Sequence, residues 1–268
     1  MSTPHTVALN PQTHQALRLR LSMPHHHAAG MMLCPVVSSE ISAAARDYVI
    51  VFPVTADDVP QALLGTQAGR NAYLAASGHW LCRFVPAHIR RYPFMVGLMG
   101  EPTDGGGRRF KVLIDDGAPH FSHTEGEALF QPDGRPTPLL DKVQASLSRL
   151  QADHMATQGM VQQLDALGLL VERALQVRGQ DGKEHRLTGF RLLDATRLQA
   201  LEPQHLADLQ RSGALLLAYA HLVSLANLHD GVLVQKPALA PSAALPAAGQ
   251  DLGFSFFPDD TIDFSRFN

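Results

Sequence analysis

The pattern of apolar and polar positions changes near Pro136, and this change separates two kinds of predicted element. Before Pro136, short apolar runs lie between Gly and Pro residues and predict strands and turns. Residues 48–53 are β-branched and aromatic, so they predict a buried strand. Further short strands are expected at residues 6–9, 17–21, 61–65, 71–74, 94–98 and 110–114.

After Pro136 the apolar residues recur at helical spacing. They predict one long helix over residues 139–167, with Gly168 as the residue after its end. Residues 169–177 and 184–192 alternate around a Gly-rich turn and predict a β-hairpin, and the last predicted helix spans residues 214–228. The sequence thus predicts an α+β fold, with a β-rich N-terminal part followed by a helical part containing a β-hairpin.

Changes in composition divide the chain into three segments. Residues 1–32 are expected to form an N-terminal arm, and residues 33–234 one domain. Within that domain, residues 33–135 form the β-rich part and residues 136–234 the mainly helical part. Residues 235–268 are an Ala- and Pro-rich linker with an acidic, Phe-rich tail, which docks either on its own domain or on a partner. The sequence leaves both alternatives open.

Composition excludes several classes of function. A net charge of -3 does not supply the basic surface that nucleic-acid binding requires. Two Cys cannot form a disulfide framework, which favours a reducing compartment. The sequence has no N-terminal signal and no apolar run near the ~20 residues that span a membrane. These observations predict a soluble cytoplasmic protein without membrane insertion.

The segment of residues 78–99 combines the only Trp with several basic and aromatic residues. Two adjacent Arg beside aromatic rings could bind a carboxylate or an acidic segment through paired hydrogen bonds. Such residues also dominate protein interfaces. The alternative is that these Arg support the fold by bonding loop carbonyl groups. The predicted partner-binding residues are Trp80, Arg90, Arg91, Tyr92 and Phe94.

The histidines give a second kind of candidate chemistry. Asp115, His120 and His123 are an alternative set of ligands for iron or zinc, but their Gly- and Pro-rich surroundings make an ordinary loop the default interpretation. The tract of residues 25–27 contains three consecutive His and is expected to be a solvated loop. His221 lies within an apolar predicted helix and is expected to be a hydrogen-bonded core residue.

Taken together, residues between about 35 and 228 resemble the bacterial SapC family. One departure is Tyr48-Val49, where the family usually has Tyr-Pro, and the tail after Val234 lies outside the family pattern. The segments that carry the resemblance are residues 43–48, 78–80, 85–94, 114–115, 126–134, 187–190 and 219–225, with Glu40, Leu64, Gly65 and Asn71.

The resemblance implies a setting rather than a reaction. The family is associated by name with surface layers and their export, and its members look like neighbours of halogenase-like, cupin-like and TonB-dependent receptor proteins. This implies a non-enzymatic accessory or binding protein in a surface-layer or peptide-modification system, with a protein or peptide as partner. The alternatives are a metal-dependent, oxygenase-like enzyme and a structural layer subunit. A homo-oligomer is compatible with each of them.

Overall fold

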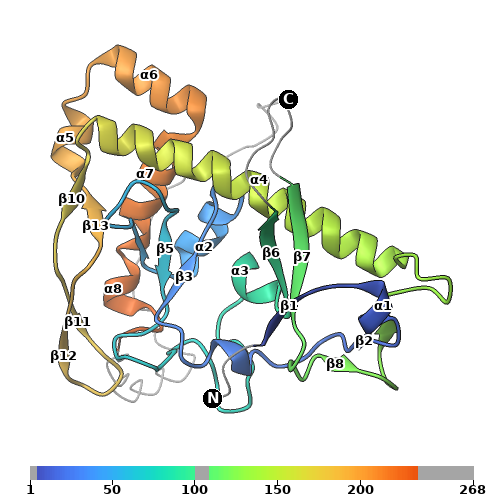
Figure 1. Ribbon diagram of the computed structural model, residues 1–268. Helices are drawn as coiled ribbons and strands as arrows, with labels where there is room; N and C mark the ends of the chain where they lie inside the picture. Colours follow the sequence, from blue (N-terminus) through green and yellow to red (C-terminus); the bar gives the residue numbers. More distant parts are fainter. Residues whose placement is uncertain (1–4, 100–108, 235–268) are drawn as a thin grey trace, which may run out of the picture. The chain divides into compact units, whose positions relative to one another are not determined.

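The computed structural model describes residues 5–99 and 109–234 and has the predicted α+β fold (Figure 1). The N-terminal part contains β1 (Thr6–Ala8), α1 (Pro11–His14), β2 (Arg18–Leu19), η1 (His26–Ala28), β3 (Leu33–Pro35), η2 (Ser38–Glu40), α2 (Ile41–Asp47), β4 (Ile50–Val51), β5 (Gln61–Leu63), α3 (Ala87–Arg90), β6 (Phe94–Met99), β7 (Arg109–Asp115), β8 (Phe121–Ser122) and β9 (Glu127–Ala128). The remainder contains α4 (Pro138–Ala166), β10 (Leu170–Glu172), β11 (Leu175–Arg178), β12 (Glu184–Leu187), β13 (Arg191–Leu193), α5 (Ala195–Gln199), α6 (Pro203–Ser212), α7 (Ala214–Ser224) and α8 (Asn227–Asp230).

The described strands form small antiparallel sheets. Three-stranded sheets have the orders β1-β7-β6, β8-β2-β9 and β3-β5-β4. The predicted hairpin is confirmed as two successive ladders, β10 with β13 and β11 with β12. Strands from the predicted N-terminal arm pair with distant partners, since Val7 lies opposite Ile114. The first 32 residues therefore supply strands to two of the sheets.

The expected strand at residues 71–74 is wrong. This segment is a turn, and Leu74 forms only an isolated bridge with Trp80. The cause is the Asn71 side chain, whose oxygen accepts the Tyr73 backbone N–H at 2.8 Å, as Asn side chains commonly do in turns. Its amide nitrogen also donates to the Ala28 carbonyl at 3.0 Å. This local bonding replaces strand pairing.

The long predicted helix is confirmed as α4, which is 29 residues long. Thr137 caps its start and Pro138 occupies its first turn, where no N–H partner is needed. Gly168 follows its end with a φ of 64°, a left-handed geometry that Gly adopts without a steric penalty. Gly159 lies inside the helix without interrupting it.

The buried apolar residues form two cores, and α4 contributes to both. The larger core includes α2, α7 and the β3-β5-β4 sheet, with Val161 and Leu164 from the second half of α4. The smaller core lies around β6 and β7, with Leu140 and Leu147 from the first half. Each fully buried aliphatic side chain stabilises the fold by about 1.5–3 kcal/mol.

His221 is a hydrogen-bonded core residue, as predicted. Its Nδ1 lies 2.7 Å from the Ile50 carbonyl, and its Nε2 lies 3.2 Å from the Leu193 backbone nitrogen. The neutral ring therefore donates to Ile50 and accepts from Leu193. Ser224, one turn later, accepts the Ile50 N–H at 3.0 Å. Two side chains of α7 thus bind both backbone polar groups of Ile50.

Within residues 5–99 and 109–234, no helix is both long and apolar enough to cross a membrane.

Candidate functional site

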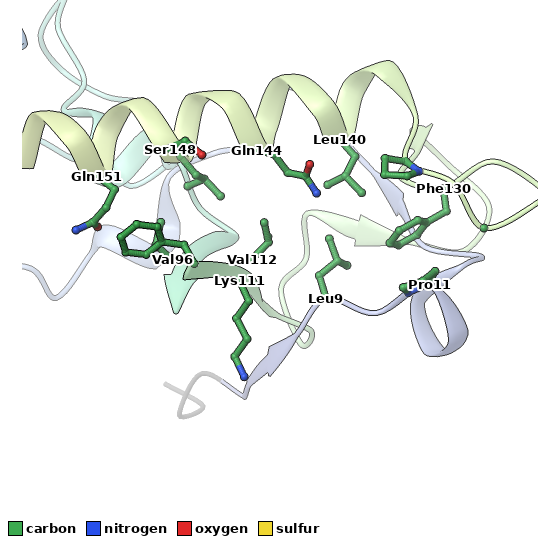
Figure 2. A pocket seen from close by; sticks show the side chains of 14 residues that line it. Leu9, Pro11, Val96, Lys111, Val112, Phe130, Leu140, Gln144, Ser148 and Gln151 are labelled. Atoms are coloured by element: carbon green, nitrogen blue, oxygen red, sulfur yellow. The ribbon is translucent and has the colours of Figure 1, made fainter. Parts of the chain in front are cut away.

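An elongated groove lies between the first half of α4 and the strands β6 and β7 (Figure 2). Its volume is about 450 Å³. Its walls are largely apolar, with polar side chains along the helix. The residues that line it are Leu9, Pro11, Val96, Phe110, Lys111, Val112, Phe130, Gly134, Pro136, Leu140, Gln144, Leu147, Ser148 and Gln151.

The two walls follow from the periodicities of helix and strand. On α4, Gln144, Ser148 and Gln151 are spaced by four and three residues, so they form one stripe on the helix surface. On the sheet, Val96 lies opposite Val112 in register, and directly paired residues share one face. In Figure 2, Leu140 and Gln144 extend from α4 toward the strands, whereas the Lys111 chain extends away from the helix.

A smaller cavity lies next to the groove at the Gln151 end. Its volume is about 30 Å³, and Val96 and Gln151 line both spaces. The other residues around it are Pro35, Val37, His88, Arg91, Leu150 and His154. One guanidinium and two imidazoles therefore lie beside the Gln151 end of the groove.

Arg91 is the charged group of this smaller cavity. It follows α3 and is half-buried, and burial lowers the pKa of its guanidinium. The Arg91 Nη2 atom donates a hydrogen bond to the Nε2 atom of His88, 3.3 Å away. Burial, together with the Arg91 charge, lowers the pKa of His88 to about 4, so this imidazole is neutral at pH 7 and can accept. No carboxylate of the described residues lies within 4.0 Å of Arg91.

The other predicted partner-binding residues lie apart from this cavity. Trp80 packs at the edge of the larger core, where its Nε1 donates to the Tyr48 hydroxyl at 2.7 Å. Arg90 is exposed, and its Nε donates to the Val85 carbonyl at 2.8 Å. This is the bonding to a loop carbonyl that the alternative interpretation expected. Phe94 is buried in the smaller core and offers almost no surface.

Tyr92 lies in a cluster of aromatic rings with buried polar groups. Its hydroxyl donates to Asp115 Oδ2 at 2.6 Å, and burial together with that bond raises the pKa of Tyr92. Its ring stacks on the His27 ring, with 4.0 Å between the ring centroids. It also packs edge-on against the His120 ring, with 4.9 Å between the centroids. The expectation of a solvated loop at residues 25–27 is wrong for His27, because packing on Tyr92 half-buries this ring.

The residues of the metal alternative meet only in part. Asp115 and His120 are buried near Tyr92, whereas His123 is exposed in the connection between β8 and β9. The Nδ1 atoms of His27 and His120 are buried and have no hydrogen-bond partner among the residues described. Across the part of the chain that the structure describes, no three His, Cys, Asp or Glu side chains are arranged to hold a metal ion.

Sequence reasoning did not find the groove or the two His beside Arg91. One usable signal was the spacing of His88 and Arg91, which lie one helical turn apart. Another was the polar stripe on the predicted long helix, next to the apolar stripe of Leu140 and Leu147. No local pattern could have placed His154 and Arg91 at one cavity, because this depends on how α4 packs against residues far from it in sequence.

Together, the fold and the cavities define an α+β protein with an elongated groove beside a small pocket that contains Arg91. The SapC family model matches residues 9–230, which is most of the chain, so the protein belongs to the SapC family. The comparison with curated proteins and the comparison with solved structures gave no match.

Proposed function

We propose that this SapC-family protein is a peptide-binding accessory protein, and that the groove between α4 and the β6–β7 strands holds an extended segment of its client. The groove supports this proposal because it combines an apolar wall, a regular stripe of polar side chains on α4 and a length suited to a short strand. The setting implied by the resemblance, surface-layer or peptide modification, requires such recognition of a polypeptide. This setting belongs to the proposal.

The polar stripe favours a peptide over a plain hydrocarbon chain. Four residues of helix rise by about 6 Å, which is close to the ~6.6 Å over which an extended chain repeats its backbone groups. Gln144, Ser148 and Gln151 can therefore donate to or accept from successive peptide groups. A hydrocarbon would leave these side chains without new partners. Apolar side chains at alternate peptide positions would face Val96 and Val112.

The groove sets the length of the bound segment. Between Leu140 and Gln151 the helix rises by about 16 Å, which corresponds to about five residues of extended chain. Small groove-binding segments of this kind rely on a few apolar anchors and on backbone hydrogen bonds. The proposal therefore concerns a short linear segment and not a large protein surface.

Fluorescence polarisation with labelled pentapeptides tests the proposal. In these peptides Leu or Val alternates with Ser, and each is compared with a peptide of the same composition in scrambled, non-alternating order. We expect saturable binding of the alternating peptide that weakens by roughly tenfold or more in Ser148→Trp, because the indole would fill the groove. Ser146→Trp is the matched control, since Ser146 is exposed on α4 and does not line the groove.

Two outcomes would overturn the proposal. One is the absence of saturable binding to the wild-type protein, and the other is equal weakening in Ser148→Trp and Ser146→Trp. Metal analysis of the same preparation addresses the enzymatic alternative. Iron or zinc near one per chain that is lost in His120→Asn would replace the peptide-binding proposal with the metal-dependent enzyme.

A further inference from the structure

We propose that the cavity beyond Gln151 receives the C-terminal carboxylate of the bound peptide, with Arg91 as the residue that binds it and His88 and His154 as its polar surroundings. This inference rests on the proposed function of the groove, and it adds the direction and the end group of the ligand. The groove would thus bind the last residues of a chain, with the terminal carboxylate at the Arg91 end.

The charge of Arg91 is the feature that indicates an acidic ligand. Arg91 is half-buried, its side chain has one described hydrogen bond, to the neutral His88, and it has no carboxylate partner among the described residues. The buried Arg191, by contrast, donates to the Pro53 carbonyl and pairs with Asp165, although its Nη2 has no partner among the described residues. A guanidinium presents five N–H donors in a planar arrangement that matches a carboxylate, so Arg91 retains donors for a ligand.

The cavity at Arg91 is small. A volume of about 30 Å³ accommodates a group about as large as one or two water-sized units, and it does not accommodate a continuing chain with side chains. Pro35, Val37 and Leu150 bound this space with apolar surface. A ligand group that occupies it must therefore be small, and a carboxylate is a small group that a guanidinium selects.

The groove and the smaller cavity are adjacent, because Val96 and Gln151 line both of them. The end group of a segment in the groove therefore needs to pass only these two side chains to reach Arg91. Lys111 is the other cation at the groove, but its side chain extends away from α4 (Figure 2). The positive charge that faces the end of the groove is therefore that of Arg91.

The test compares one peptide sequence with a free or an amidated C-terminus. We expect the wild-type protein to bind the free acid roughly tenfold or more tightly than the amide. In Arg91→Gln this preference should fall below about twofold, while the amide should bind as it does to the wild-type protein. Arg91→Lys retains the charge without the planar donor pair and should give an intermediate preference. Arg149→Gln is the control, because Arg149 is an exposed residue of α4 outside both cavities.

The outcomes separate this inference from the proposed function. Equal binding of acid and amide, with loss of both in Ser148→Trp, would overturn the carboxylate site and leave the peptide groove standing. An amidated peptide with an internal Glu that binds as tightly as the free acid would also overturn it, because a side chain would then be the recognised group. Loss of the preference in Arg149→Gln as well would show a general charge effect and contradict a specific site.

Discussion

The two cores of the protein treat their polar groups in opposite ways. In the larger core, His221 and Ser224 use their side chains to bind the backbone of Ile50 and Leu193. In the region of the smaller core, the Arg91 guanidinium has a single neutral partner beside an open groove. His221 and Ser224 thus use buried polar groups to hold elements together, whereas Arg91 has donors available for a ligand.

Glu40, beside the larger core, is another buried polar residue whose side chain binds the backbone. Burial raises the pKa of this carboxyl, yet its Oε2 accepts the Ala87 backbone N–H at 2.9 Å. A buried polar group with partners contributes to a unique structure, whereas one without partners raises the free energy of the folded protein. A half-buried cation with unused donors beside a cavity, such as Arg91, is therefore the place where we propose a ligand.

The largest expected effect is on the satisfied core. His221→Ala removes the partner of the Ile50 carbonyl and of the Leu193 N–H, and it leaves a cavity at a fully buried position. We expect a loss of about 3–4 kcal/mol in the free energy of unfolding, measured by urea denaturation. Val223→Ala on the same helix is the control, because Val223 is 66% exposed and should change stability by less than about 0.5 kcal/mol. A similar small change for both variants would contradict the contrast between the cores.

The second prediction concerns pH. Burial lowers the pKa of His221 from 6.5 to about 4, so between these values the unfolded chain binds the proton and the folded chain does not. The stability from the neutral ring is therefore present above pH 6.5 and is lost as the pH falls toward 4. This group alone accounts for a decrease of up to about 3 kcal/mol.

Urea midpoints at pH values from 7.5 to 4 measure this slope. His27 and His88 shift in the same direction, each to about 4, so they add to the wild-type slope. His221→Gln should remove only the contribution of His221 to this slope, so the stability of the variant should fall less steeply with pH below 6.5. An unchanged slope in this variant would mean that His221 does not contribute to the loss of stability at low pH.

The sequence predicted much of this fold because its signals were local. The helix α4 had apolar residues at helical spacing, a capping Thr137 and a terminal Gly168. The hairpin had alternation around a Gly-rich turn. The strand expected at residues 71–74 was wrong because Asn71 bonds locally, and a strand propensity scale does not include that competition.

The candidate site was only partly predictable for a related reason. Arg91 was predicted as a partner-binding residue because it follows another Arg and lies near aromatic residues. The groove, by contrast, depends on the packing of α4 against two strands far from it in sequence. The five predicted residues lie within one short segment of the chain, residues 80–94, but they have different surroundings in the structure. Trp80 packs at the edge of the larger core, Phe94 lies in the smaller core, and Arg90 donates to a loop carbonyl. Closeness in sequence did not produce one surface, because this segment turns from a loop into α3 and then into β6.

The smallest expected effect is that of Arg91→Gln on stability, which tests whether Arg91 supports the fold as His221 does. Arg91→Gln removes a half-buried charge whose described hydrogen bond goes to the neutral His88, so the free energy of unfolding should change by less than about 0.5 kcal/mol. If Arg91 instead supported the fold, the same change would destabilise it by about 2 kcal/mol or more, as loss of a buried charged partner does. Urea denaturation of Arg91→Gln beside Arg149→Gln distinguishes these cases. If Arg91→Gln leaves stability unchanged and abolishes the preference for a free carboxylate, Arg91 serves binding and not folding. His221 in the larger core would then be its opposite, a buried polar residue that serves folding.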